Sequence, residues 1–326
     1  MAATRSTARA LWYTAKGKVE IREETLCPPA ADQVLVRTLF SGVSRGTERL
    51  VSAGLVGECE WQRMRAPLQD GDFPFPVKYG YCATGIVEDG PKKLRDRPVF
   101  VLHPHQTRFL APLAMAVPVP DGVPPRRAVL AANMETALNA LWDAGAGAAD
   151  RIAVVGGGIV GLLVGYLAAR LPGAEVTLVD VVRERRSLAE ALGIAFATPE
   201  AAPAEADVVF HTSATEAGLA TAIACAGEEA TIVELSWYGA GATPVPLGGA
   251  FHSRRLKLVA SQVGAVAARR RARWSHRRRL EAALALLADP RLDTLLTAEI
   301  AFEDAPRLLP QLLGAGTKGL APVIRY

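Results

Sequence analysis

The spacing of hydrophobic positions divides the chain into two parts. Up to about residue 120, short runs rich in β-branched and aromatic residues are separated by Gly, Pro and Asp, a pattern typical of β-strands. Beyond residue 125, apolar runs of strand length alternate with longer segments of helical spacing, and this predicts a parallel, doubly wound sheet. The fold class that follows is α/β, with a β-rich part before the parallel sheet.

Turn signals place the individual elements. In the β-rich part we expect strands at 10–15, 19–22, 33–40, 99–103 and 107–111, and an irregular segment from 48 to 75. The second part predicts helices at 127–144, 159–171, 183–192 and 216–225, and strands at 151–155, 175–180, 207–211 and 230–235. A basic helix, a strand at 297–302, a helix at 305–313 and a strand at 321–326 follow. We therefore expect domains at 1–128 and 129–265, and a C-terminal part at 266–326.

Composition narrows the class of protein. The chain has 326 residues, half of them hydrophobic, and no apolar run approaches the length of a membrane span. Residues 1–9 lack the apolar core of a secretory signal, and the four cysteines lie far apart, which favours isolated reduced thiols over a disulfide framework. We expect a cytoplasmic protein with no membrane partner.

The net charge of +4 is unevenly spread, because residues 269–279 contain seven arginines. Such a run can form a solvated helix face, contact an anionic ligand or a carboxylate-rich partner, or bind nucleic acid. It leads directly into an amphipathic segment, and no nucleic-acid-binding motif accompanies it. We favour the solvated helix face and expect no nucleic acid partner.

A glycine-rich motif follows the strand predicted at 151–155. Gly156, Gly158 and Gly161 form G-x-G-x-x-G, and Ile159 and Val160 open the next helix. In that context the first glycine permits a tight turn, the second lets the backbone approach a pyrophosphate, and the third lets helix and strand pack closely. The helix N-terminus adds N–H groups that face the phosphates. The motif predicts a dinucleotide cofactor.

Asp180 ends the next predicted strand, nineteen residues after Gly161. A carboxylate there can accept hydrogen bonds from the ribose hydroxyls of the adenosine, and it repels a 2′-phosphate, so we expect NAD, with NADP less favoured. Three arginines just downstream, Arg183, Arg185 and Arg186, are the opposing signal because they could hold a 2′-phosphate.

These motifs, in this order, resemble the medium-chain dehydrogenase/reductase superfamily over nearly the whole chain. Residues 33–37 (QVLVR) resemble its early strand, 41–48 (SGVSRGTE) its G-x-C-x-x-D active-site loop, and 78–85 (KYGYCATG) its G-H-E-x-x-G segment. Residues 133–138 resemble its interdomain helix. The resemblance implies a GroES-like β-rich domain, a Rossmann domain and a C-terminal return to the first domain, in a nicotinamide-dependent oxidoreductase.

The zinc ligands of that superfamily are replaced. Where its alcohol dehydrogenases carry Cys, His, and Cys or Asp, this chain has Ser44, Tyr81 and, near the third position, Ala132. A hydroxyl, a phenol and a methyl group make a poor zinc site, and the lobe of four cysteines is missing from the sequence. We expect a zinc-free member with no other metal. The loop most resembles the bacteriochlorophyllide a dehydrogenase branch, which oxidises a hydroxyethyl side chain on a tetrapyrrole.

Without zinc, another group must stabilise the alkoxide-like oxygen during hydride transfer. The resemblance brings Ser44, Thr47 and Tyr81 to the zinc position, with Glu48 beside them. Tyr81 can donate a hydrogen bond, and its pKa could fall beside NAD⁺; alternatively, its ring only fills the zinc cavity. Glu48 can act as an acid, as a substrate anchor or as a structural residue.

Other candidates are weaker. His103 and His105 alternate, so in a strand both imidazoles would point the same way and could mimic a metal pair, although surface or hydrogen-bonded histidines are the simpler interpretation. We include His103, with Trp237 and Tyr238, among candidates for the substrate cleft.

The resemblance also assigns cofactor contacts by position. It implies that Arg45 contacts the pyrophosphate and that the backbone at Thr212 and Ser213 passes the adenosine ribose. Backbone groups after the fifth and sixth strands would hold the nicotinamide carboxamide, and the residues there are Leu235, Ser236 and Gln262.

We therefore predict a zinc-independent, NAD(H)-dependent oxidoreductase that interconverts an alcohol and a carbonyl of a small-molecule substrate. The alternatives are a reductase of an activated C=C bond, a hydroxyalkyl-tetrapyrrole dehydrogenase and, least favoured, a non-catalytic NAD-binding protein. Because superfamily members commonly pair edge strands of their Rossmann sheets, we expect a homodimer.

Overall fold

The computed structural model describes residues 6–314, 316 and 319–326, and the chain divides into two compact units. Unit 1 runs to Ala132 and resumes at Leu284, and unit 2 spans Asn133–Ala283. Residues 1–5, part of the N-terminal segment without a signal-type apolar core, lie outside the described residues. Among the helices that the structure describes, none has the length and apolar character that crossing a membrane requires.

Unit 1 is built on two β-sheets. One has the strand order β2-β1-β5-β4, and the other has the order β16-β17-β3-β6-β7-β9, with β8 also paired to β3. The strands are β1 (Ser6–Ala15), β2 (Lys18–Leu26), β3 (Gln33–Gly42), β4 (Asp70–Gly71), β5 (Val77–Lys78), β6 (Ala83–Asp89), β7 (Pro98–Val101), β8 (Arg108–Pro112), β9 (Val117–Pro118), β16 (Ala298–Ala301) and β17 (Pro322–Arg325); the α-helices are α1 (Arg45–Ser52), α2 (Pro125–Ala128) and α9 (Ala305–Leu312).

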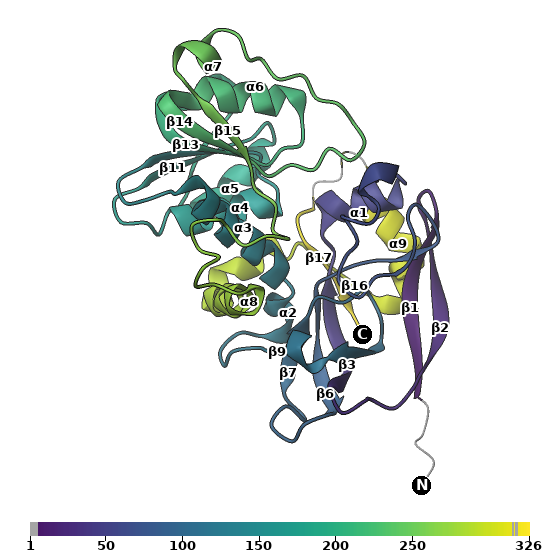
Figure 1. Ribbon diagram of the computed structural model, residues 1–326. Coiled ribbons are helices and arrows are strands. Elements are labelled where there is room, and N and C mark those ends of the chain that lie inside the picture. The colour runs from purple at the N-terminus through teal and green to yellow at the C-terminus, as the bar shows by residue number, and fades with distance from the viewer. Residues whose placement is uncertain (1–5, 315, 317–318) are drawn as a thin grey trace. The chain divides into compact units, whose positions relative to one another are not determined.

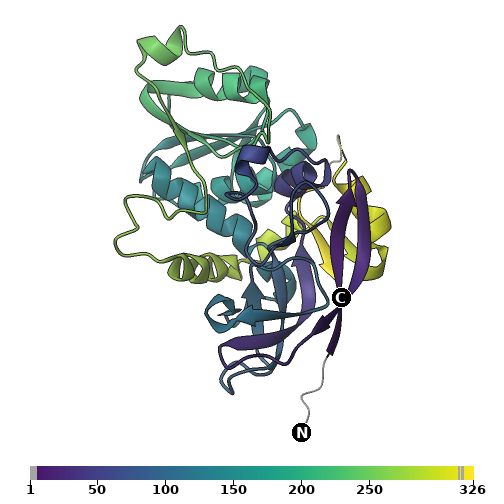
Figure 2. The same cartoon turned by 45° about the vertical axis from the view of Figure 1, so that its right-hand side comes forward.

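The C-terminal strand completes the sheet of unit 1. β17 pairs antiparallel with β3, with Val323 opposite Gly42, so the last strand of the chain lies beside its third strand (Figure 1). α9 packs against β2 of the other sheet (Figure 2). This is the expected return of the chain to its first part.

Unit 2 is a six-stranded parallel sheet with the order β12-β11-β10-β13-β14-β15. β10 is buried from Ile152 to Val155, as expected for a strand covered on both faces. Its strands are β10 (Arg151–Val155), β11 (Glu175–Val179), β12 (Ala195–Ala197), β13 (Ala206–His211), β14 (Ala226–Glu234) and β15 (Lys257–Ala260); the α-helices are α4 (Ile159–Ala168), α5 (Arg186–Ala191), α6 (Glu216–Cys225) and α7 (Ala250–Ser253), with α3 (Ala131–Ala144) and α8 (His276–Ala285) at its boundaries. The predicted α/β class, a β-rich part plus a doubly wound parallel sheet, is confirmed.

Three sequence expectations need correction. We expected an irregular segment from residue 48, but residues 45–52 form the helix α1. A helix this short does not persist alone, and burial of Glu48, Leu50 and Val51 stabilises it here. Residues 103–105 follow the end of β7 at Val101 and are not in a strand, so the two histidines have different surroundings.

The arginine-rich segment is also not a single solvated helix face. Residues 269–273 form turns before α8 begins at His276. Arg279, within α8, is buried and donates to Glu135 Oε1 over 2.9 Å and to the amide oxygen of Asn139 over 2.5 Å. That arginine anchors α8 to α3 because its charge is paired and its donors are satisfied.

Candidate functional site

The glycine turn joins β10 to α4 in unit 2. Gly156 has φ +110°, which a residue with a Cβ rarely adopts, and a Cβ there would lie 2.6 Å from the backbone nitrogen of Ser213. A Cβ on Gly161 would collide with the carbonyl oxygen of Gly156, so close helix–strand packing requires the third glycine. Beside Gly158, the N-cap of α4, no atom lies within 4 Å of where a Cβ would stand. The turn is therefore open where a phosphate would approach the helix N-terminus.

This turn lies at the point where the strand order reverses. β10 pairs with β11 on one side and with β13 on the other, and ligands of doubly wound sheets bind at that position. Ile159 and Val160 open α4 as predicted, and their N–H groups belong to the first turn, which lacks intrahelical acceptors. Thr212, at the end of β13, donates to the carbonyl oxygen of Gly156 over 2.7 Å and fixes the turn to the neighbouring strand.

Asp180 follows β11 and is folded onto the glycine turn. Its carboxylate accepts hydrogen bonds from the backbone N–H groups of Gly157 and of Val182, the latter over 2.7 Å. Each carboxylate oxygen keeps a second lone pair for a ribose hydroxyl. A Cβ on Gly157 would lie 2.9 Å from Asp180 Oδ2 and 3.4 Å from Arg185 Cγ, so both side chains lie beside the same turn. Burial lowers the pKa of Arg185, and the nearby Asp180 charge offsets part of that shift.

A second polar group lies at the carboxyl ends of β13 and β14, where sequence reasoning missed two of its members. His211 Nδ1 lies 2.7 Å from Glu234 Oε2, and His211 Nε2 lies 2.7 Å from Ser213 Oγ. Burial alone would raise the pKa of Glu234, but hydrogen bonds from His211 and Ser236 outweigh it and hold that pKa below its ordinary value. A carboxylate beside Nδ1 favours the tautomer in which Nε2 accepts from Ser213. The signal in the sequence was a histidine and a glutamate that end adjacent strands.

The residues predicted after the fifth and sixth strands surround this group. Leu235 donates its N–H to the carbonyl oxygen of His211 over 3.0 Å, and Gln262 accepts from the N–H of Gly264 over 2.6 Å. Trp237 and Tyr238 are half-buried, and the Tyr238 hydroxyl donates to Glu234 over 3.2 Å. Burial and the adjacent Glu234 raise the pKa of Tyr238 to about 12, so the phenol is protonated and acts as a donor.

In unit 1, Glu48 organises the loop that carries Ser44. The carboxylate is completely buried and accepts from the N–H of Ser44 over 2.7 Å and from the Tyr13 hydroxyl over 2.8 Å. His105 Nε2 lies 3.0 Å from the same carboxylate. Three groups thus converge on Glu48, which identifies it as a positioning residue of the loop.

The network continues away from Glu48 through residues that the sequence did not single out. Ser41 Oγ lies 2.7 Å from His105 Nδ1 and 2.8 Å from the hydroxyl of Tyr326. Ser41 and Tyr326 come from paired regions of β3 and β17, which brings residues 285 positions apart into contact. No local spacing in the sequence could indicate this arrangement.

Tyr81 is buried near the loop that carries Ser44 and Thr47. Burial raises the pKa of Tyr81 well above its ordinary value, and the side chains of Ser44 and Thr47 offset only part of that rise. This direction is opposite to the fall we considered from the sequence, and it leaves a neutral phenol. The Tyr79 ring packs edge-on against Tyr81, with centroids 6.0 Å apart, and helps to fix its orientation.

The remaining predicted residues have other surroundings. Arg45 donates to the carbonyl oxygens of Leu312, over 3.0 Å, and of Gly319. His103 is buried and stacks on Phe109 with ring centroids 3.8 Å apart, and its Nδ1 lies 2.9 Å from the carbonyl oxygen of Pro104. The expectation that the two histidines point the same way is wrong, because His103 packs against a phenyl ring and His105 contacts Glu48.

The donor chemistry at the former zinc position does not fit zinc. Ser44 offers a hydroxyl, Tyr81 a phenol whose pKa is raised, and Ala132 no donor at all, whereas zinc sites use thiolate, imidazole or carboxylate ligands. Within residues 6–314, 316 and 319–326, no group of three or more His, Cys, Asp and Glu side chains is placed to hold a metal.

Comparisons with known proteins identify the fold. No family model matches the sequence. Among solved structures, the chain is similar to L-idonate 5-dehydrogenase from Escherichia coli K-12, with a TM-score of 0.82, 16% identity and 99% of each chain covered. It is also similar to a protein described as a zinc-binding dehydrogenase from Sinorhizobium meliloti, bound to NADP, with a TM-score of 0.77, 19% identity, and 98% of this chain and 100% of that chain covered. An alcohol dehydrogenase from E. coli CFT073, complexed with NADH, gives a TM-score of 0.78 at 14% identity, over 98% of this chain and 100% of its own. The chain therefore has the two-part fold of these dehydrogenases.

Proposed function

We propose that this protein is a nicotinamide-dependent oxidoreductase that interconverts an alcohol and a carbonyl by hydride transfer without zinc. The observation that carries the cofactor assignment is the open glycine turn at the reversal point of the unit 2 sheet, with Asp180 folded beside it. Asp180 favours NAD over NADP, whereas Arg185 at the same turn opposes that preference. Solved proteins of this fold with NADH and with NADP support a nicotinamide cofactor.

When bound, the nicotinamide supplies or accepts the hydride. The chain's own residues bind the cofactor and polarise the substrate oxygen. The N–H groups at the start of α4 and the backbone at Gly158 bind the pyrophosphate, and Asp180 binds the adenosine ribose. After β14, hydrogen bonds from His211 and Ser236 to Glu234 keep that turn in one conformation.

We assign the role of the missing zinc to Tyr81. Because burial keeps its phenol protonated, Tyr81 can donate a hydrogen bond to the oxygen of the substrate, where negative charge develops. We propose that Ser44 and Thr47, whose side chains influence the pKa of Tyr81, orient its hydroxyl, and that Glu48 fixes the backbone of that loop through the N–H of Ser44. Tyr81 is thus the proposed catalytic residue, and Ser44, Thr47 and Glu48 position it.

The test is Tyr81→Phe, which removes one oxygen and preserves the ring. Since one oriented donor contributes about 3–4 kcal/mol to the barrier, we expect kcat to fall about 100-fold with little change in NADH affinity, and Thr47→Val to have a smaller effect. Tyr79→Phe is the matched control, because that phenol is buried in the same cluster but has no assigned role. Normal kcat in Tyr81→Phe, together with unfolding of Tyr81→Ala, would mean that Tyr81 only fills space.

Two further measurements separate the alternatives. We expect activity to survive chelation and metal analysis to find no stoichiometric zinc; one zinc per chain, lost together with activity, would overturn the metal-free reaction. Turnover of secondary alcohols but not of quinones or enones supports alcohol oxidation, and the reverse pattern favours a C=C reductase. Binding of NADH without turnover on either panel favours a non-catalytic protein.

We also propose a substrate class, a cellular location and an oligomeric state. We expect a small-molecule substrate in the cytoplasm, and a homodimer formed through β15, an edge strand of the unit 2 sheet. Edge strands carry backbone donors and acceptors that a second copy can pair. Light scattering after gel filtration tests the dimer, and Val259→Pro on β15 is expected to yield a monomer.

A further inference from the structure

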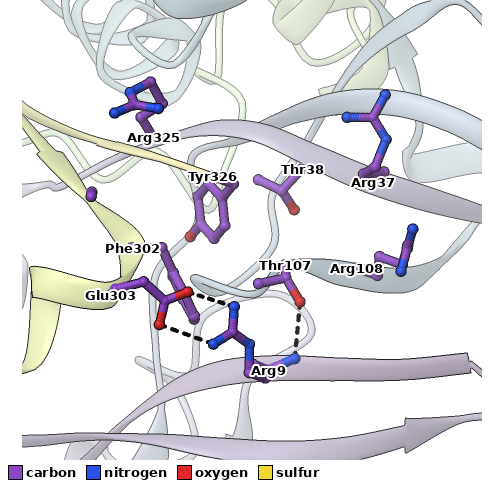
Figure 3. Close-up of a pocket in the computed structure, with 10 residues that line it drawn as sticks. Arg9, Arg37, Thr38, Thr107, Arg108, Phe302, Glu303, Arg325 and Tyr326 are labelled. Atoms are coloured by element: carbon purple, nitrogen blue, oxygen red, sulfur yellow. Dashed lines mark hydrogen bonds and ion pairs between the residues drawn. The ribbon is translucent and has the colours of Figure 1, made fainter.

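A cavity of about 410 Å³ lies wholly within unit 1, apart from the dinucleotide-type turn of unit 2. Five elements or their flanks contribute its walls: β1, β3, β8, the turn at 301–303 and β17 with Tyr326. Small-molecule sites occupy about 300–1,000 Å³, so the cavity has the size of a metabolite site. The charged and aromatic lining residues, shown in Figure 3, are Arg9, Arg37, Arg108, Phe302, Glu303, Arg325 and Tyr326.

The charge of the lining is strongly positive. Among the side chains that line the cavity, four guanidinium groups face a single carboxylate, that of Glu303. Arg9 forms a two-fold ion pair with Glu303, with N–O distances of 2.9 and 2.5 Å, so this pair is locally neutral (Figure 3). Arg37, Arg108 and Arg325 bring the excess charge.

The carboxylates behind these arginines are shared. The Glu88 carboxylate forms ion pairs with Arg37 Nε, at 3.1 Å, and with Arg108 Nε, at 2.9 Å. The Glu299 carboxylate forms ion pairs with Arg325 Nε, at 3.3 Å, and with Arg126 Nε, at 2.9 Å. Glu88 therefore serves two guanidinium groups that line the cavity, whereas Glu299 serves one that lines it, that of Arg325, and one that does not, that of Arg126.

Donors as well as charge remain available. The shortest carboxylate contacts of Arg37 and Arg325 run through Nε, at 3.1 and 3.3 Å, and within the described residues their terminal NH₂ groups make no hydrogen bond. A guanidinium presents such groups as a planar fork that matches the oxygen atoms of phosphate and carboxylate. Phe302 and Tyr326, with ring centroids 4.9 Å apart, supply an apolar wall beside them.

Stabilisation of the fold does not explain this arrangement. The side chains of Arg9, Arg37, Arg108 and Arg325 are 41–58% exposed, and ion pairs this exposed contribute about 0–1 kcal/mol each. Clustering the arginines also introduces repulsion between like charges. A bound anion removes that repulsion and uses the open donors.

We propose that this cavity binds a small multivalent anion, a phosphate ester or a polycarboxylate, at a site separate from the cofactor. Phosphate is tetrahedral and carboxylate is planar, but both present pairs of oxygen atoms that a guanidinium group can bind. The aromatic wall can pack against the carbon part of such a molecule. The proposal does not depend on the proposed hydride transfer, because every residue it uses belongs to unit 1 and lies outside the loop of Tyr81.

Isothermal titration of the full chain with inorganic phosphate and, separately, with citrate tests the site. We expect saturable binding of at least one probe below about 10 mM. Binding of phosphate alone identifies a phosphate ester as the ligand class, and binding of citrate alone identifies a polycarboxylate. No saturable binding of either probe would overturn the proposal.

Variants then locate the binding. Arg37→Gln combined with Arg325→Gln is expected to weaken the bound probe about tenfold or more, since two charge-assisted contacts are lost. Glu303→Gln is expected to tighten it severalfold, because the one carboxylate among the lining side chains becomes neutral. Arg95→Gln is the matched control: Arg95 is 53% exposed, is paired with Asp89 and does not line the cavity, so its replacement should change affinity less than about twofold.

Two outcomes contradict the assignment to this cavity. Equal weakening by Arg95→Gln would indicate non-specific attraction to a basic protein. Weaker binding in Glu303→Gln would mean that the Arg9–Glu303 pair shapes the cavity and that the positive charge of the lining does not select anions. Thermal melts of all three variants confirm that the exposed substitutions leave the fold intact.

Discussion

Each unit of the molecule contains a Ser–His–Glu network with a tyrosine hydroxyl on the glutamate, and the two networks differ in how they are assembled. In unit 1, His105 links Ser41 to Glu48 across sequence separations of 64 and 57 residues. In unit 2, His211 links Ser213 to Glu234 across separations of 2 and 23 residues. The same side-chain chemistry is therefore built once from distant strands and once from adjacent strand ends.

The networks also differ in exposure. The side chains of His105 and Glu48 are both completely buried, whereas the Glu234 side chain is 16% exposed beside a buried His211. A buried, satisfied network fixes one conformation, because any lost partner leaves a polar group without water. A network at the carboxyl edge of a parallel sheet faces the place where ligands bind. We interpret the network around Glu48 as the support of the Ser44 loop. We interpret the network around Glu234 as part of the cofactor edge, by which we mean the carboxyl ends of the unit 2 strands.

Removing each glutamate should separate these interpretations most strongly. Glu48→Ala leaves the Tyr13 hydroxyl, the His105 ring and the Ser44 N–H without their acceptor, so we expect the free energy of unfolding to fall by about 3–5 kcal/mol. Glu234→Ala, whose site water can reach, should cost about 1 kcal/mol. Urea unfolding followed by circular dichroism measures both. Equal losses would remove the distinction between the two networks.

The pH dependence of stability provides a second effect in unit 1, which is smaller when expressed per pH unit. Burial lowers the pKa of His103 to about 3, so between pH 3 and 6.5 the unfolded chain binds a proton that the folded chain does not. Stability should therefore fall as the pH drops through that window, by about 1.4 kcal/mol per unit from this residue. His103→Phe keeps a ring packed against Phe109. The free energy of unfolding of this variant should fall less steeply as the pH drops, by the slope that one bound proton contributes. An unchanged slope would show that His103 is not the titrating group.

The smallest effect tests the cofactor edge. Asp180→Ser should leave stability nearly unchanged but reduce the preference for NADH over NADPH at least about tenfold, because the repulsion of a 2′-phosphate is lost. Fluorescence titration with both cofactors measures the ratio, and Asp207→Ser, on β13 of the same sheet, is a control. Tighter binding of NADPH than of NADH to the unaltered protein would mean that the arginines near Arg185 dominate.

The difference in assembly explains which parts of the structure the sequence predicted. The strand at 151–155, the start of α4 at Ile159 and the helix at 216–225 were predicted with the bounds observed, since period, glycine spacing and capping are all local signals. The tight turn at Gly156 and the close packing at Gly161 were likewise predicted. Ligand-binding edges of parallel sheets are encoded by short segments, so sequence reasoning finds them.

The network around Glu48 could not be predicted in the same way. Tyr13 occupies a buried position of β1 like an ordinary core residue, and His105 lies in a short non-strand segment. Their convergence depends on the pairing of β1 with β5 and with the segment at 105–106, where Leu11 donates to the carbonyl oxygen of His105 and Ala10 forms a bridge with Gln106; no local pattern specifies these pairings. The raised pKa of Tyr81 was missed for the same reason, because burial is set by the tertiary structure.

The pairing of β17 with β3 has a consequence for the order of events during synthesis. Unit 2 is one continuous segment, whereas unit 1 has two segments separated by the whole of unit 2. A ribosome therefore releases all of the parallel sheet before β16 and β17 exist. Until then β3 lacks the partner that faces Ser41, and an unpaired strand edge can associate with other chains. We expect nascent chains that stop before β16 to hold a folded nucleotide-binding half and an aggregation-prone β half.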